Sequence, residues 1–318
     1  MKRRFMAALV AGVSALALTA CGQSGDKELT IGLTFVPDVQ FAPFYVAEHE
    51  GFFDEEGVTV ALRHHGVSEA LFGALTAGEE DLIVAGGDEM LQAYSQGVDV
   101  RTIATLYQRY PLAIAARSDL GLTTVADLAG HTIGVPGPFG ESWFALLATL
   151  ESAGLSESDL GIEYIGYTAQ SAMYTEAVDA VVVFTNNDLL GLEAAGVDVT
   201  LIETPDLPLV GISVGARGDA IYGQPEALAG ILRALDRAIE FIVADPDAAI
   251  EIVGTKVPEM DADFARAVLD ATIPLYGSEW LSLDTSMWPE MYEFMQSHDL
   301  AEPGADPDGA YEDLDWTP

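Results

Sequence analysis

The sequence predicts an α/β protein of two lobes, each built on a mostly parallel sheet. First, short apolar runs alternate with helical segments along residues 29–214. This alternation is typical of parallel sheets with helical crossovers. Second, the alternation restarts after the apolar run 112–116, which indicates a second sheet. Third, helical patterns dominate from residue 224 onward, and we expect these helices to return to the first lobe.

The first lobe is predicted from five apolar runs and the helices between them. The expected strands are 29–33, 58–62, 81–85, 101–106 and 112–116, and the expected helices are 42–50, 68–77 and 89–96. Gly51 ends the first helix, and Ser68 is a plausible N-cap of the second. Gly86 and Gly87 allow close backbone approach, and Asp88 can cap the helix that follows.

The second run of alternation predicts the second lobe. Its expected strands are 132–135, 162–165, 179–184 and 197–202, and its helices are 124–128, 141–153, 169–176 and 187–195. A further strand at 209–214 and helices at 225–243, 246–253, 261–273 and 285–297 complete the pattern. We expect the first lobe to comprise 29–116 and 209–300, and the second 117–208. Residues 301–318 are predicted to be a loosely held acidic tail.

The N-terminus has the pattern of a bacterial lipoprotein signal at residues 1–20. Lys2, Arg3 and Arg4 precede an apolar stretch, and Leu-Thr-Ala before Cys21 is similar to a lipobox. Cys21 is the only cysteine, so no disulfide can form within the chain, and we expect it to be lipidated. Residues 21–28 are small and polar, as a tether should be. The predicted location is the outer side of the cytoplasmic membrane, held by lipid.

The charge excludes some partners. The chain carries 13 basic and 51 acidic residues, a formal charge of −38, and loss of three basic signal residues takes it to about −41. Such a surface repels nucleic acid, and no basic patch is visible. Outside the N-terminus no apolar run is long enough to span a bilayer.

The loop 35–45 is unusual in composition. It joins a predicted strand to a helix, where ligands bind in open α/β sheets. It holds aromatics (Phe35, Phe41, Tyr45) with two prolines, Gln40 and Asp38. A stiff loop of this kind suits a flat organic ligand. The alternative is that the aromatics belong to the core.

Three further loops follow predicted strands. The segment 134–143 has glycines spaced GxxGxxG, so it is neither a dinucleotide fingerprint nor a P-loop. Phe139 and Trp143 could face a ligand there, or Trp143 could be core. Tyr167 and Gln170 follow one strand, and Asn187 and Asp188 follow another, where they could equally be helix caps.

Signals of catalysis or metal binding are weak. His64 and His65 are adjacent, but the other histidines have no ligand spacing, so a solvated pair is expected and no metal. No GxSxG motif or arguable carboxylate pair is present. We therefore predict a protein that is not an enzyme and has no cofactor.

Four motifs carry a resemblance to a known family. They are FAPFYVA at 41–47, GFF with Gly57-Val58 at 51–58, DLAGHTIG at 127–134 and Val178-Asp179-Ala180. Over residues 29–297 the chain resembles the substrate-binding lipoproteins of ABC importers, in the group that shares its fold with thiamine-pyrimidine synthases and sulfonate binders. The resemblance implies a type II periplasmic-binding-protein fold, with two lobes joined by a two-strand hinge that closes on ligand.

Within that group, four segments look most like riboflavin-type binders. These are VQFAPFY at 39–45, QRYP at 108–111, PGPFG at 136–140 and Asn186-Asn187-Asp188. The last is usually Asn-Asn-Glu, so Asp188 shortens the reach of that carboxylate. The cysteine-rich motif of the pyrimidine synthases is absent from the sequence.

The resemblance implies a monomeric binding protein that passes a small solute to an ABC permease and its ATPase. We expect a flat heteroaromatic ligand, riboflavin first and a thiamine pyrimidine precursor second. The alternatives are a sulfonate or taurine binder and a thiamine-pyrimidine-forming enzyme. The candidate ligand contacts are Asp38, Gln40, Phe41, Tyr45, Glu89, Tyr110, Gly137, Phe139, Gly140, Trp143, Tyr167, Gln170, Asn187 and Asp188.

Overall fold

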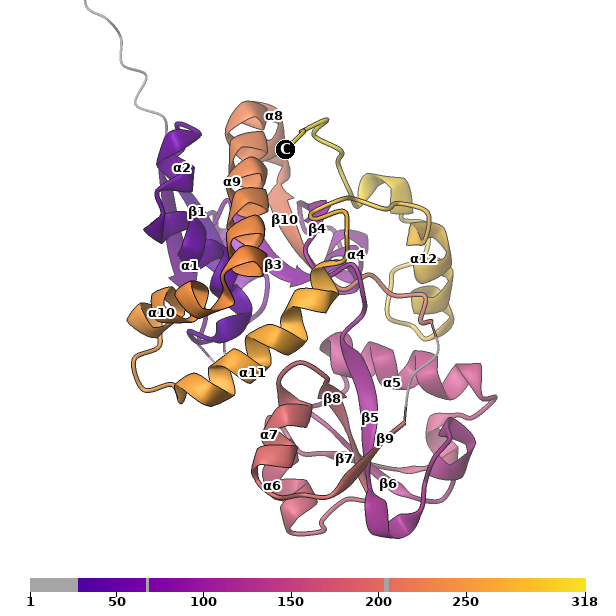
Figure 1. Ribbon diagram of the computed structural model, residues 1–318. Helices are drawn as coiled ribbons and strands as arrows, with labels where there is room; N and C mark the ends of the chain where they lie inside the picture. Colours follow the sequence, from indigo (N-terminus) through magenta and orange to yellow (C-terminus); the bar gives the residue numbers. More distant parts are fainter. Residues whose placement is uncertain (1–27, 67–68, 203–205) are drawn as a thin grey trace, which may run out of the picture.

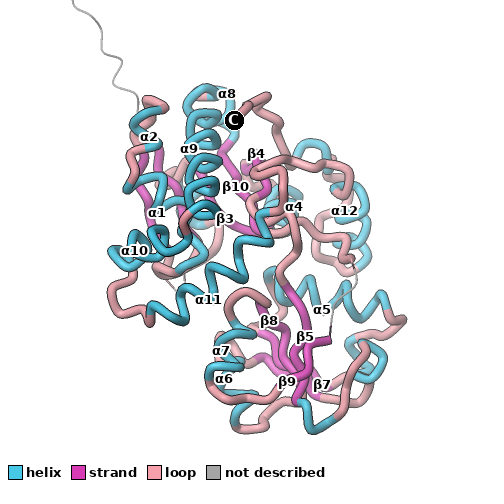
Figure 2. Tube along the Cα trace, viewed as in Figure 1, coloured by secondary structure: helices cyan, strands magenta, loops and turns pink. Residues whose placement is uncertain are grey.

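Two separate five-stranded sheets with their helices divide the described chain into two lobes. The structure is a computed structural model, and it describes residues 28–66, 69–202 and 206–318. Figure 1 shows the first lobe above and the second below, and Figure 2 shows that their strands do not merge. The predicted fold class is confirmed, since one continuous sheet would have contradicted it.

The first sheet draws its strands from distant parts of the chain. In spatial order it contains β2 (Val60–His64), β1 (Leu29–Leu33), β3 (Leu82–Gly86), β10 (Ile212–Arg217) and β4 (Val100–Thr105). β1 lies parallel to both β2 and β3, whereas β10 runs antiparallel to β3 and β4. Every residue of β3 is buried, because helices cover both faces of this sheet.

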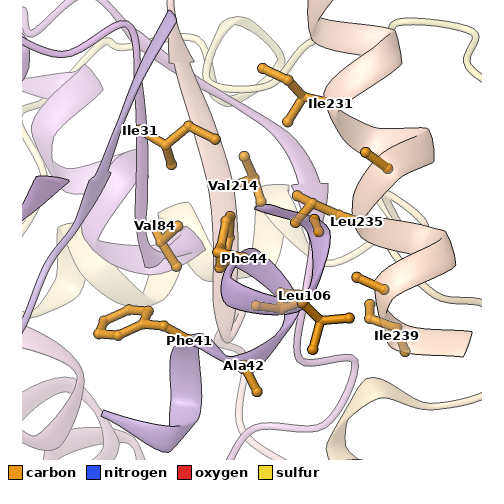
Figure 3. Close-up of a cluster of buried hydrophobic side chains, with 14 of the residues drawn as sticks. Ile31, Phe41, Ala42, Phe44, Val84, Leu106, Val214, Ile231, Leu235 and Ile239 are labelled. Carbon is orange, nitrogen blue, oxygen red and sulfur yellow. The ribbon is translucent and has the colours of Figure 1, made fainter. Parts of the chain in front are cut away.

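The largest core lies between this sheet and α9. The helices of the first lobe are α1 (Ala42–His49), α2 (Phe52–Glu55), α3 (Gly73–Ala77), α4 (Gly87–Ser95), α8 (Gly218–Gly223), α9 (Pro225–Ala244), α10 (Pro246–Lys256), α11 (Ala262–Thr272) and α12 (Trp288–Ser297). Figure 3 shows Phe44 of α1 between Val84 of the sheet and Leu235 of α9. Burial of one such side chain contributes about 1.5–3 kcal/mol.

The second sheet is a contiguous piece of chain. In spatial order it contains β7 (Gly161–Tyr164), β6 (Thr132–Val135), β8 (Ala180–Phe184), β5 (Leu112–Arg117) and β9 (Val199–Ile202), with helices α5 (Gly140–Ser152), α6 (Ala169–Tyr174) and α7 (Asp188–Ala194). β6 is parallel to β7 and β8, and β5 is antiparallel to β8 and β9. Short 3-10 helices are η1 (Val39–Phe41), η2 (Ser118–Leu120), η3 (Val125–Leu128), η4 (Glu157–Asp159), η5 (Ile273–Tyr276) and η6 (Pro307–Gly309).

The chain passes between the lobes earlier than the sequence predicts. We expected the first lobe to run to residue 116, but β5 pairs with β8 and β9 of the second sheet. The first crossing therefore lies at 106–111, between β4 and β5. β4 and β5 are both short apolar strands, so local pattern gave no sign of which sheet each would join. The second crossing lies between β9 and β10, and β10 begins at Ile212 and not at the expected 209.

The C-terminal residues are docked, which corrects the expectation of a loose tail. The backbone N–H of Thr102 donates to the carbonyl of Ala310, and the N–H of Glu312 donates to the carbonyl of Thr102, both at 2.9 Å. Ala310 is fully buried. The tail thus covers the open side of β4, an edge that would otherwise present unpaired backbone groups.

Some predictions fall outside the described residues. The signal at 1–20, Cys21, almost all of the tether 21–28 and the proposed cap Ser68 are among them. Within the described ranges, no helix combines the length and the apolar character that crossing a bilayer requires.

Candidate functional site

The ends of several strands meet where the two lobes touch. We call this region the junction; it comprises residues 34–41, 86–89, 106–111, 136–141, 165–168, 184–188 and 272–276. Six of these segments follow the carboxyl ends of β1, β3, β4, β6, β7 and β8. Ligands in open α/β sheets bind at such ends, because loops and helix N-termini converge there.

An aromatic contact bridges the lobes at the junction. The rings of Phe35, after β1, and Tyr167, after β7, have centroids 6.3 Å apart and planes tilted by 58°. Tyr167 is 64% exposed, and Phe139 at the start of α5 is 56% exposed. Large aromatic side chains left this open suit contact with a ring that is not part of the chain.

A polar contact joins the lobes at a second point. The Nδ2 of Asn186, after β8, donates to Oγ1 of Thr272 at the end of α11, at 2.9 Å. Both side chains are buried. Tyr107, on the first crossing, lies beside both side chains and packs its ring 5.8 Å from that of Tyr276.

Three acidic residues meet at a third point, and we call Asp88, Glu89 and Glu141 the carboxyl cluster. The Tyr110 hydroxyl donates to Oδ2 of Asp88 at 2.6 Å, and the backbone N–H of Glu89 donates to Oδ1 at 2.7 Å. Oε2 of Glu89 accepts from the N–H of Gly86 at 3.1 Å. The Glu89 carboxylate also lies beside the backbone N–H of Glu141, which lowers its pKa, so α4 of one lobe reaches the start of α5 in the other.

Burial dominates the chemistry of the carboxyl cluster. It raises the pKa of Glu89 from 4.5 to about 7. Burial, with the charges of Asp88 and Glu89 adding to it, raises the pKa of Glu141 well above its ordinary value. Glu141 is 7% exposed, and its Oε1 has no hydrogen-bond partner among the described residues. A carboxyl group in such surroundings favours its neutral, protonated form.

Three of the aromatics predicted to contact ligand are core residues instead. Phe41 and Tyr45 are 2% and 0% exposed, and the Tyr45 hydroxyl lies 3.0 Å from Nε2 of His64. Trp143 is 6% exposed and packs edge-on against Tyr164. The sequence did hold a signal for the first two, since residues 41–47 have no polar face. A helix that is apolar all round is buried all round.

The remaining predicted residues divide between the junction and local roles. Gln170 is exposed and donates to the carbonyl of Gly191 at 2.7 Å, and Asn187 makes no side-chain cap bond to α7. Asp188 accepts from the N–H of Phe184 at 3.0 Å. Burial raises the pKa of Asp188, and the charge of Asp38 from the other lobe adds to it.

The two candidate glycines have steric reasons to be glycine. A Cβ on Gly137 would lie 2.3 Å from the ring of Phe139. Gly140 has φ +72°, and a Cβ there would lie 3.0 Å from Oε1 of Glu89. Gln40 is half-buried, and its backbone N–H donates to Oδ1 of Asp38 at 3.1 Å.

Histidines take structural positions. His65, expected to be solvated, is 3% exposed and lies 2.8 Å from Oε1 of Glu80. His64 is half-buried beside Tyr45 and the carbonyl of Phe35. Across the described residues, no group of three or more His, Cys, Asp or Glu could hold a metal ion.

Sequence reasoning missed Phe35 as the partner of Tyr167, and it missed Glu141, Asn186 and Thr272 as contacts between the lobes. A glutamate in a first helical turn and an asparagine after a strand are ordinary, so only tertiary structure reveals them. Two hollows of about 520 and 370 Å³ lie elsewhere, beside the C-terminal tail and between α5 and α12, and contain none of the predicted residues.

Comparison with known proteins gives a consistent result. Residues 38–249 match the model of the family described as NMT1/THI5 like. The chain is 32% identical over 286 residues to the riboflavin-binding protein RibY of Chloroflexus aurantiacus, covering 86% of this chain and 82% of RibY. It is 23% identical to the 4-amino-5-hydroxymethyl-2-methylpyrimidine phosphate synthase of Legionella pneumophila, covering 81% and 83%. Among solved structures, the periplasmic aliphatic sulphonate binding protein SsuA from Escherichia coli superposes with a TM-score of 0.77 at 16% identity, covering 92% and 94%.

Proposed function

The chain belongs to the NMT1/THI5-like family, and from this premise we propose that it is the solute-binding protein of an ABC importer with riboflavin as its ligand. The likeness to RibY supports this proposal, and the likeness to SsuA supports the fold that it needs. A binding protein of this fold holds its solute between two lobes and closes on it by a hinge motion.

The aromatic contact between Phe35 and Tyr167 carries the proposal. A flat ring inserted between two aromatic rings needs about 7 Å, two contacts of roughly 3.5 Å each. The centroids lie 6.3 Å apart with the planes tilted by 58°, so a small separation of the lobes, with rotation of the two rings toward parallel, would open a slot for a ring. Each face of an inserted isoalloxazine would then gain about 0.5–1.5 kcal/mol from stacking beyond area burial.

The charge of the junction favours a neutral ligand over an anion. Five acidic residues lie there: Asp38, Asp88, Glu89, Glu141 and Asp188. The one arginine or lysine of the junction is Arg109, which is exposed. A sulfonate needs cationic or strong donor groups, whereas riboflavin is uncharged at neutral pH. The junction therefore supports a flavin above a sulfonate.

Titration of riboflavin with purified protein tests the ligand. We expect saturable quenching of flavin emission, and weaker binding by Phe35→Ala and Tyr167→Ala, each by about 2- to 12-fold. Tyr174→Ala is the matched control, because Tyr174 is 71% exposed on α6 and lies outside the junction. Unchanged emission at micromolar protein, with a thiamine pyrimidine precursor raising the melting temperature, would replace riboflavin by that precursor.

The enzyme alternative has a separate test, because one relative is a pyrimidine phosphate synthase. We propose that this chain has no catalytic role. Incubation with riboflavin or pyrimidine precursors, followed by mass spectrometry, should return the input compounds unchanged. Any turnover that depends on the protein would contradict the proposal.

The proposed location follows from Cys21. We propose that this residue carries a lipid that holds the monomeric protein on the extracytoplasmic face of the membrane, where it meets the permease and ATPase of the importer. Cys21→Ser should appear in the soluble fraction of fractionated cells. Recovery of this variant on the membrane as fully as wild type would argue against the anchor.

A further inference from the structure

The carboxyl cluster lies on both sides of the lobe contact. Asp88 and Glu89 begin α4 in the first lobe, and Glu141 lies in the first turn of α5 in the second. The Glu89 carboxylate lies beside the N–H of Glu141, and a Cβ built on Gly86 would lie 2.9 Å from Cγ of Glu141. These groups are therefore in contact only while the lobes are together.

The surroundings of the cluster supply no positive charge. The titratable groups that face it are Tyr110 from the first crossing, Tyr107 beside Glu141, and Tyr167 from the loop after β7. Within the described chain, none of the three carboxyls forms an ion pair with Lys, Arg or His. The Oε1 of Glu141 is buried without a partner, although a carboxylate oxygen in that position needs a donor or a proton.

Contact between the lobes therefore changes which protonation state these carboxyls favour. When the lobes separate, water reaches the faces of these carboxyls that the other lobe had covered, and the charged form becomes more favourable. When the lobes meet, ionised carboxylates lose water and approach one another, and both effects oppose the charged form. Closure is consistent with the structure only if the cluster binds protons.

We propose that Asp88, Glu89 and Glu141 form a proton-binding site shared by the two lobes, so that closure takes up protons. Because solute binding requires closure, this inference rests on the proposed function for its effect on affinity. The sign follows from linkage: the closed state binds more protons, so closure is favoured at low pH and is lost as pH rises through the closed-state pKa values. In the range between the open-state and closed-state pKa values, each proton taken up on closure makes the closure constant fall about tenfold per unit rise in pH.

Closure can be measured without any solute. In a Cys21→Ser background, spin labels at Asp54→Cys on the first lobe and Glu157→Cys on the second report the distance between lobes by double electron–electron resonance. Both positions are exposed and lie outside the junction segments. We expect the short-distance population to fall from pH 5 to pH 9. Glu141→Gln and Glu89→Gln, which keep shape but cannot ionise, should each retain this population at higher pH.

Glu193→Gln on α7 is the matched control, because Glu193 is an exposed carboxyl of the second lobe. A wild-type distance distribution that is the same at every pH would overturn the proposal. It would also be overturned if the distance distributions of Glu141→Gln and Glu89→Gln both changed with pH in the same way as that of Glu193→Gln. Melting curves for both variants guard against misfolding.

Riboflavin titrations over the same pH range separate the two proposals. A dissociation constant that rises with pH in wild type, and rises less in Glu141→Gln, supports both. Riboflavin could instead fail to bind while the distance between the lobes still depends on pH in wild type and not in the variants. That result would exclude riboflavin as the ligand and would still support the proton-binding site.

Discussion

Buried carboxyl groups occur in two places in this protein, and their neighbours differ. Glu80, fully buried before β3, accepts from Nη1 of Arg63 at 2.6 Å and lies 2.8 Å from Nε2 of His65. We call these three residues the Glu80 cluster. The carboxyl cluster at the junction has a tyrosine and backbone N–H groups as neighbours, but no cation within the described chain.

The difference separates a structural arrangement from a functional one. A cation beside Glu80 keeps its charge compensated whatever the lobes do, because Arg63, His65 and Glu80 all belong to the first lobe. The junction carboxyls come from two lobes. At each closure they therefore lose contact with water and come into contact with one another. Buried ionisable groups without a charge partner are frequent at functional sites.

Removal of the cation from the Glu80 cluster should have the largest effect. We expect Arg63→Met to lower the free energy of unfolding by about 2 kcal/mol, because the buried Glu80 carboxylate loses a charged hydrogen-bond donor while His65 remains. Urea denaturation measures this. Arg117→Met removes an arginine whose partner Asp119 is largely exposed, and should change stability far less. Equal losses in the two variants would break the comparison.

The pH dependence of stability should be set by the titration of the carboxyl cluster at the junction. Glu89 has a folded-state pKa raised from 4.5 to about 7. The stability that protonation of Glu89 contributes is therefore fully present below pH 4.5 and is lost as pH rises through about 7. Between these values one such proton gives a slope of at most about 1.4 kcal/mol per pH unit. Thermal unfolding from pH 5 to 8 should show stability falling in wild type and falling less in Glu89→Gln; a slope that the substitution leaves intact would assign the titration elsewhere.

Loss of the tyrosine donor to the cluster should have a smaller effect. Tyr110→Phe removes the hydrogen bond to Oδ2 of Asp88, and we expect a cost of about 1 kcal/mol. Calorimetry at pH 5 measures it, with Tyr222→Phe as control because Tyr222 is 70% exposed. A Tyr110→Phe protein as stable as wild type would mean that the Asp88 carboxyl finds another donor.

The smallest effect is expected from Glu141→Gln at pH 5. Glu141 is protonated there if the cluster binds protons, so a neutral amide of the same shape should change stability by less than about 0.5 kcal/mol. Chemical denaturation at that pH provides the measurement. A large loss would show that the Glu141 carboxyl is ionised when buried, which contradicts its assignment as a proton acceptor.

The fold was predictable because each strand carries its own signal. Runs such as 81–85 are short and apolar, lie between turn residues and alternate with helices, so they specify an α/β arrangement locally. The sheet that a strand joins is not a local property. β5 resembles β4 in composition, and only its pairing with β8 and β9 shows that the chain has already crossed to the second lobe.

The candidate site was less predictable, for two physical reasons. Loop aromatics such as Tyr45, Trp143 and Tyr167 have the same chemistry in sequence, yet the first two are buried and the third is open. The carboxyl cluster depends on three residues from α4 and α5, separated by about fifty positions and by the lobe contact. Their pKa values arise from burial, which no spacing of acids along the chain encodes.

The position of β10 has a consequence for how the protein is made. The first sheet cannot be completed until Arg217 is available, because β10 lies between β3 and β4. The second sheet needs only residues 112–202. A chain that emerges N-terminus first therefore exposes β1 to β4 before it can pair them fully, while the inserted lobe already has all its strands. The lobe that is second in sequence is the one able to fold first, and the N-terminal strands must be kept from aggregating until the rest of the chain has emerged.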